Sequence, residues 1–345
     1  MPQSVRCLSF HATYRCRHSG DCCAAGWPIP IEADRLARLR VAVANGTLHA
    51  AGSHTQPFVT TDAAPADTPA LLGVDEHRCV FYDLDRRDGR CRIHAALGHE
   101  ALPLACRQFP RVSVRDPRGV SITLSHYCPT ALLLLDDPRP VTIVTNPPAF
   151  PAGGEYVGLD ATTSLPPLLR ANLLMDWDSW WRFEALAVES IAGETAPAPP
   201  SDGLARLHAV VEHVRTWRPG EGALNTVVAG AFERTSAGLD TSLWHARFAE
   251  EKTSLVNEAL DAIPADLRGS VPQRDGTITP ARRERNFLAA HAFANWSAHT
   301  GRDLRAWFRS LETAWALLQA GYSVRQADLV LRHLSDYSAP MNGYG

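Results

Sequence analysis

The N-terminal part of the chain contains Cys16-Arg17-His18-Ser19-Gly20-Asp21-Cys22-Cys23, the stretch that decides how this part folds. Gly20 permits a tight backbone turn, so thiols several residues apart can converge on one centre. Adjacent side chains diverge in a strand or a helix. Cys22 and Cys23 therefore share one ion only if the chain turns there, and otherwise they serve two separate centres.

All cysteines of the 345-residue chain precede residue 129, namely Cys7, Cys16, Cys22, Cys23, Cys79, Cys91, Cys106 and Cys128. Cysteine used as a small hydrophobe would be scattered through the whole core. Clustered thiols instead indicate disulfides or metal. Residues 1–7 lack the apolar stretch of a secretory signal, and no apolar run approaches the ~18 residues of a membrane span. We therefore expect a cytoplasmic protein with reduced thiols, in which all eight cysteines are candidate metal ligands.

The identity of the metal stays open at this point. Thiolates select zinc, Cu(I) or iron–sulfur clusters over hard ions. The cysteine spacing matches neither the zinc-finger pattern nor the common ferredoxin patterns. Eight thiols are enough for two sites of four thiolates each, or for one such site with four cysteines left over. A histidine could complete a site, although an ordinary hydrogen-bonded histidine is the commoner case; the candidates are His11, His18, His77, His94, His99 and His126.

The expected fold is mainly α (α+β). Residues 112–114 and 120–124 alternate around Asp116-Pro117-Arg118-Gly119, which predicts a hairpin, and 141–145 predicts a third strand. A turn at Asp88-Gly89 is expected between the segments of Cys79 and Cys91. We expect an irregular, cysteine-rich metal-binding domain over 1–146 and a helical domain over 147–345.

Several helices can be placed by periodicity. Residues 31–43 predict a helix that stops at Asn45-Gly46, and 47–69 predict a long loop. The strongest helix is predicted over 303–319, with one buried stripe and a stop at Gly321. The stripe consists of Leu304, Trp307, Phe308, Leu311, Trp315 and Leu318.

The charge of the chain argues against two classes of binding partner. The net charge is −3 and no basic block is present, so we expect neither nucleic acid nor a membrane as a partner.

Several stretches around the cysteines form a recognisable series. They are Tyr14-Arg15-Cys16, residues 22–31 from Cys22-Cys23 through Gly26-Trp27, Cys79-Val80-Phe81-Tyr82, Cys91-Arg92-Ile93, Leu97-Gly98, Cys106-Arg107-Gln108-Phe109-Pro110-Arg111 and Cys128-Pro129. In content and order they resemble the cysteine motifs of flagellin lysine N-methylases, and the resemblance continues faintly through Asp176-Trp177 and Arg285-Asn286-Phe287-Leu288. The same blocks are shared more loosely with small cysteine-cluster proteins described as zinc- or iron-chelating domains. In the pattern of those smaller proteins, a cysteine stands where this chain has Ser19.

The resemblance implies a 4Fe-4S cluster and methyl transfer from S-adenosylmethionine to the ε-amine of a protein lysine, as in flagellin. No glycine-rich loop after a strand is present to cradle that cofactor in a Rossmann-type fold. Pro110 should end a helix and leave Arg107 and Arg111 beside the cysteine centre. A guanidinium there could bind the carboxylate of S-adenosylmethionine through two hydrogen bonds, or neutralise thiolates, or pair with acidic residues.

Three hypotheses of function therefore remain. The first is an iron–sulfur methyltransferase, and the second is a non-catalytic zinc- or iron-binding protein. The third is a redox-sensing thiol switch, which would need exposed cysteines of low pKa.

Overall fold

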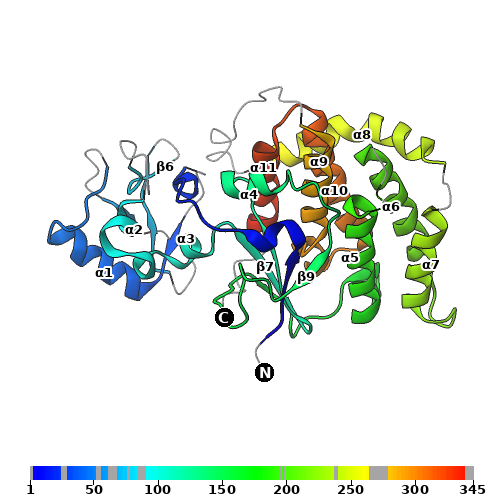
Figure 1. Ribbon diagram of the computed structural model, residues 1–345, viewed down its shortest axis with the longest axis horizontal. Coiled ribbons are helices and arrows are strands. Elements are labelled where there is room, and N and C mark those ends of the chain that lie inside the picture. The colour runs from blue at the N-terminus through cyan, green and yellow to red at the C-terminus, as the bar shows by residue number, and fades with distance from the viewer. Residues whose placement is uncertain are drawn as a thin grey trace.

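A computed structural model describes residues 3–24, 29–51, 56–60, 68–75, 78–83, 91–194, 196, 199–236, 240–263 and 279–338. Figure 1 shows a small lobe at one end, which we define as residues 16–108, and a larger main body that contains the rest of the described chain. The helices and small sheets confirm the predicted α+β class. No helix within the described ranges is long and apolar enough to cross a membrane.

A five-stranded sheet forms one part of the main body, with strand order β10-β7-β8-β1-β9. The predicted hairpin is confirmed as β7 (Arg111–Asp116) and β8 (Gly119–Leu124). The predicted third strand is β9 (Ile143–Thr145), but it pairs with β1 (Val5–Leu8) rather than with the hairpin. β1 runs parallel to β8, and β10 (Leu159–Asp160) runs parallel to β7.

Gly119 is required where β8 begins. Its φ is +129°, and a Cβ atom there would lie 2.1 Å from the carbonyl oxygen of Ser4. A side chain at this position would therefore push away the chain that leads into β1.

The small lobe is built from short elements around its own hydrophobic core. The helix predicted over 31–43 is α1 (Ala33–Ala44). The predicted loop 47–69 contains the two-residue strand β3 (Phe58–Val59). Within that loop, residues 52–55 and 61–67 lie outside the described residues. The other elements are η2 (Asp21–Cys23), β2 (Pro30–Ile31), β4 (Ala70–Leu72), β5 (Val74–Asp75), β6 (Arg78–Cys79), α2 (Arg92–Leu97), η3 (His99–Ala101) and α3 (Leu104–Gln108).

The helices of the main body cover the sheet and enclose the largest hydrophobic core. That core includes Leu8 and Val114 of the sheet, so the sheet and the helices share one interior. The elements are η1 (Ser9–Thr13), α4 (Pro129–Leu134), β11 (Leu168–Arg170), β12 (Leu173–Leu174), α5 (Trp177–Ala192), α6 (Pro200–Arg215), α7 (Leu224–Ser236), α8 (Ser242–Asp261), α9 (Ala281–Ala292), η5 (Trp296–His299), α10 (Leu304–Gln319) and α11 (Val324–Ser338).

Helix α10 confirms its sequence prediction. The Asp303 side chain accepts a hydrogen bond from the Ala306 N–H and so caps the helix, and Gly321 follows its end with a φ of +85°. All six residues of the predicted stripe are buried in the main core. Trp307 lies at the centre, with its ring edge-on to that of Trp180 at 6.2 Å between centroids.

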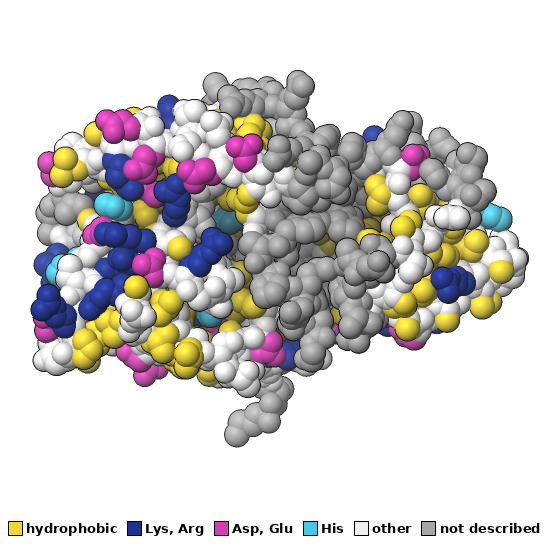
Figure 2. Space-filling view, turned by 180° about the vertical axis from the view of Figure 1, so that it is seen from behind, with side chains coloured by type: hydrophobic (Ala, Val, Ile, Leu, Met, Phe, Trp, Pro, Cys, Tyr) yellow, Lys and Arg dark blue, Asp and Glu magenta, His cyan; other side chains and the backbone are white. Residues whose placement is uncertain are grey.

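The predicted boundary at 146–147 stays a prediction. The hydrophobic cores do not divide the described chain at that boundary. Residues of β1, β7 and β9 pack with the helical part, whereas residues between 23 and 102 form the core of the small lobe. On the face seen in Figure 2, acidic and basic side chains intermingle over the main body, in agreement with exposed ion pairs such as Arg305–Glu212.

Candidate metal centre

Five cysteines meet in the small lobe, in or against its hydrophobic core: Cys22, Cys23, Cys79, Cys91 and Cys106. The turn expected at Gly20 is present, with a φ of +79°, and η2 follows it directly. As a result the adjacent thiols of Cys22 and Cys23 lie on one side, with 3.9 Å between their sulfurs. Two sulfurs that bind one zinc ion at about 2.3 Å in a tetrahedral site lie about 3.8 Å apart. This pair thus has the separation that a shared ion needs.

Cys23 occupies the middle of the group. Hydrogen bonds with the thiols of Cys22, Cys79 and Cys91, together with burial, raise the pKa of Cys23 well above its usual value. Two of these hydrogen bonds lower the pKa of the partner thiol. The hydrogen bond from Cys23 lowers the pKa of Cys22, and it lowers the pKa of Cys91 to about 7.

The fifth thiol, Cys106, is electrostatically coupled to the others. Burial raises the pKa of Cys106 well above its usual value, and the charges of Cys22, Cys79 and Cys91 raise it further. A cation that binds these thiols would replace their protons and satisfy several thiolates together.

Short elements bring the later cysteines to this place. Cys79 ends β6, where it pairs with Val74, and an isolated bridge joins Tyr82 to Cys91. Cys91 immediately precedes α2, and the backbone N–H groups of Ile93 and His94 also lower its pKa. The turn predicted at Asp88-Gly89 lies outside the described residues.

Helix α3, which carries Cys106, is fixed to the helix α1 region. Glu32 directly precedes α1, and its Oε1 accepts a hydrogen bond from the Leu104 N–H at 2.9 Å. The charge of Glu32 also contributes to the raised pKa of Cys106.

Cys16 and Cys128 form a separate group around Tyr14. The Tyr14 hydroxyl lies 3.9 Å from the Cys128 sulfur, and burial, followed by the charges of both cysteines, raises the pKa of Tyr14. Cys16 is exposed and Cys128 is buried. Cys16, at the start of the small lobe, and Cys128, in the main body, thus lie close to one tyrosine.

Cys7 is part of the sheet. It lies in β1 opposite Ile122 and Val144, is fully buried, and donates a hydrogen bond to the Leu8 carbonyl at 3.3 Å. Burial raises the pKa of Cys7 to about 12, so its thiol is neutral at physiological pH. It behaves as a small core residue.

The thiols are not arranged as a finished coordination sphere. Among the residues that the structure describes, no group of three or more His, Cys, Asp or Glu side chains is placed so as to hold a metal ion. Cys23 nevertheless has hydrogen-bond contacts with the thiols of Cys22, Cys79 and Cys91, so these four thiols lie close together.

One comparison agrees with this geometry. Residues 15–129 match a family model described as "CxxCxxCC: Putative zinc- or iron-chelating domain". The match includes every cysteine except Cys7 and spans about a third of the chain. No curated protein matches the chain. No solved structure matches it either. The resemblance to zinc- or iron-chelating domains is thus supported, and the one to flagellin lysine N-methylases has no support.

The candidate histidines that the structure describes lie in two different parts of the molecule. The rings of His18 and His94 stack at 4.9 Å between centroids, and His99 lies edge-on to His94, beside the helix that follows Cys91. Burial, then the charges of His18 and His99, lowers the pKa of His94. His11 and His126 lie instead inside the main body, with their Nε2 atoms 3.2 Å apart. His77 lies outside the described residues.

Arg107 and Arg111 flank the break that Pro110 was predicted to cause. Helix α3 ends at Gln108 and β7 begins at Arg111. Arg107 forms an ion pair with Glu155 at 2.8 Å, whereas Arg111 donates to the carbonyls of Gln108 and Arg107. Both guanidinium groups thus have protein partners, and their binding of a cofactor carboxylate stays a prediction.

A buried polar group in the main body was not predicted. It joins His11, His126, His291, Asp328 and Arg332. Its members come from segments far apart in the chain, and only Asp328 and Arg332, about one turn apart on α11, are linked by a local spacing. Only the three-dimensional structure identifies it.

Proposed function

We propose that the small lobe binds a zinc or iron ion through thiolates drawn from Cys22, Cys23, Cys79, Cys91 and Cys106, without itself being catalytic. The supporting observation is that the Cys23 thiol contacts three other thiols that lie on three separate segments. The match to a zinc- or iron-chelating domain over the same residues supports the same chemistry.

The number of thiols suits a closed site. Four thiolates complete a tetrahedral zinc or iron coordination sphere, so five candidates leave one in reserve. Binding neutralises repulsion between thiolates that lie in a mostly apolar surrounding. Since a bound ion crosslinks segments from residue 22 to residue 106, it should also stabilise the lobe.

The test is elemental analysis of protein purified without oxygen, combined with acid-labile sulfide and an absorption spectrum. Zinc or iron at about one ion per chain, without sulfide, agrees with the proposal. Stoichiometric sulfide with iron indicates an iron–sulfur cluster instead. Protein that holds no metal under these conditions, and that does not take up added zinc or ferrous iron, contradicts the proposal.

A second candidate is an iron–sulfur enzyme that transfers a methyl group from S-adenosylmethionine to a protein lysine, for example in flagellin. The observation that favours a function beyond chelation is the large helical main body, which contains a pocket. Isotope transfer from labelled S-adenosylmethionine to flagellin, with the anaerobic protein and with metal-depleted protein, tests it. Absence of transfer by the protein that carries a cluster excludes this candidate.

A further inference from the structure

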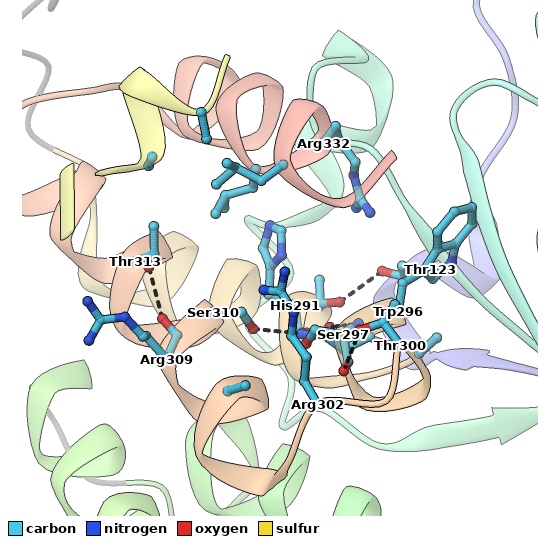
Figure 3. Close-up of a pocket in the computed structure, with 18 of the residues that line it drawn as sticks. Thr123, His291, Trp296, Ser297, Thr300, Arg302, Arg309, Ser310, Thr313 and Arg332 are labelled. Atoms are coloured by element: carbon cyan, nitrogen blue, oxygen red, sulfur yellow. Dashed lines mark hydrogen bonds between the residues drawn. The ribbon is translucent and has the colours of Figure 1, made fainter. Parts of the chain in front are cut away.

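The main body contains a pocket that is distinct from the cysteine group. Its volume is about 640 Å³, and its walls come from α8, α9, α10 and α11, with Thr123 of β8 on the inner side. Figure 3 shows the polar side chains around this hollow, among them His291, Arg302 and Arg332. Apart from Thr123, every lining residue lies between 255 and 334, outside the segment that matches the chelating domain.

The pocket carries an excess of positive charge. Three arginines and one glutamate line it: Arg302, Arg309, Arg332 and Glu258. Arg309 is balanced by Glu258 at 2.8 Å, and Arg332 lies 3.6 Å from Asp328 behind the wall. Among the described residues, Arg302 has no acidic partner within ion-pair distance. One positive charge therefore faces the pocket without compensation.

The His291 side chain forms part of the inner wall of the pocket. The His291 side chain is only 10% exposed, and its Nε2 lies 3.7 Å from the Asp328 carboxylate without a hydrogen bond to a described residue. In Figure 3 the Arg302 side chain extends from the rim of the hollow toward His291.

The remaining wall is largely apolar. Its apolar residues include Leu331, Leu334 and Trp296, of which Leu334 and Trp296 are only partly buried. Trp296 is held in place because its indole N–H donates to the Ser113 carbonyl at 3.1 Å. Concave apolar walls with a few convergent polar groups are typical of small-molecule sites.

We propose that this pocket binds a small organic anion that has an apolar body, with its carboxylate or sulfonate at Arg302 and its body against the apolar part of the wall, which includes Leu334 and Trp296. The uncompensated guanidinium selects the charge, and the apolar wall removes the body of the ligand from water. This site is independent of the metal and of the proposed function.

The test uses two probes that share an aromatic body. 8-Anilinonaphthalene-1-sulfonate carries the anion, and N-phenyl-1-naphthylamine lacks it. We expect the sulfonate to bind with a stoichiometry of one and more tightly than the amine, as measured by fluorescence titration. Arg302→Ala should weaken sulfonate binding at least about tenfold, because a hydrogen bond to a charged group is lost. Arg302→Lys should restore part of the affinity, and binding of the amine should not change.

Arg305→Ala is the matched control, since Arg305 lies three residues further along, in the first turn of α10, is exposed and pairs with Glu212 away from the pocket. It should leave sulfonate binding unchanged. The proposal is overturned if the sulfonate fails to bind, if the amine binds equally well, or if Arg302→Ala and Arg305→Ala have the same effect. Circular dichroism spectra of the variants verify that each exposed substitution leaves the fold intact.

Discussion

The Asp328 carboxylate lies between two histidines, with its Oδ1 3.7 Å from both His126 Nδ1 and His291 Nε2. Its other oxygen accepts hydrogen bonds from the Ser125 hydroxyl at 2.6 Å and the Tyr127 N–H at 3.2 Å. Asp328 is fully buried. One side chain of α11 thus joins helix α9 to the segment that leads from β8 to Cys128.

The same helix contacts the start of the small lobe about one turn earlier. Arg325 pairs with Asp21 at 2.6 Å, next to Cys22, and its guanidinium lies over the ring of Tyr127 at 4.7 Å. Residues three apart on a helix lie on neighbouring parts of one face. One face of α11 therefore connects the interior of the main body with the segment that carries Cys22 and Cys23.

Asp328→Asn should destabilise the protein by about 3–5 kcal/mol, because it removes the negative charge from a buried group that includes Arg332. Chemical denaturation at pH 7 measures this change in the free energy of unfolding. Asp136→Asn is the control, since Asp136 forms a more exposed ion pair with Arg283; its cost should stay under about 1 kcal/mol. Equal effects of the two substitutions would show that the Asp328 group has no special role in stability.

Stability should fall as the pH decreases below about 6.5, in part through His291. Burial, together with the charge of Arg332, lowers the pKa of His291 from 6.5 to about 3. Between these values the unfolded chain binds a proton at this position and the folded chain does not, so acidification favours unfolding. His291→Asn should reduce the slope of unfolding free energy against pH by about 1.4 kcal/mol per pH unit between pH 5.5 and 4. An unchanged slope in the variant would contradict the buried, neutral state of His291.

Arg325→Ala should loosen the segment around Cys22 and Cys23. The partly exposed ion pair with Asp21 and the contact with the Tyr127 ring together contribute about 1 kcal/mol. We expect amide hydrogen exchange over residues 16–24 to become several-fold faster, with exchange in α10 unchanged. Arg139→Ala, which breaks an exposed pair with Asp137, should change neither region. Uniform acceleration throughout the chain would indicate global destabilisation instead.

The elements that could be predicted from the sequence are those whose formation depends on residues close together in the chain. The β7–β8 hairpin follows from alternation around a Pro-Arg-Gly turn, and α10 follows from one apolar stripe with a cap at Asp303. Strand β1 was not predicted, because its four residues gain their place only through parallel pairing with β8, more than a hundred residues away.

The gathering of cysteines could be predicted only in part, and their binding of a metal stays a prediction. Confinement of cysteine to one part of the chain indicated a shared centre, and five thiols do meet. Which five meet depends on the turn at Gly20 and on the bridge between Tyr82 and Cys91, neither of which spacing alone determines. Cys7 was the weakest of the eight candidates in sequence, and it lies in the sheet as a buried thiol.

The metal content of two alanine variants tests the central claim most directly. Cys23 contacts three other thiols, whereas Cys7 lies within β1 with a pKa raised to about 12. Both proteins are purified without oxygen beside the unmodified chain, and zinc and iron are measured per folded chain. We predict that Cys7→Ala retains the full metal content and that Cys23→Ala loses most of it. Retention of metal by Cys23→Ala, or its loss from a folded Cys7→Ala protein, would contradict a metal centre built on the five thiols of the small lobe.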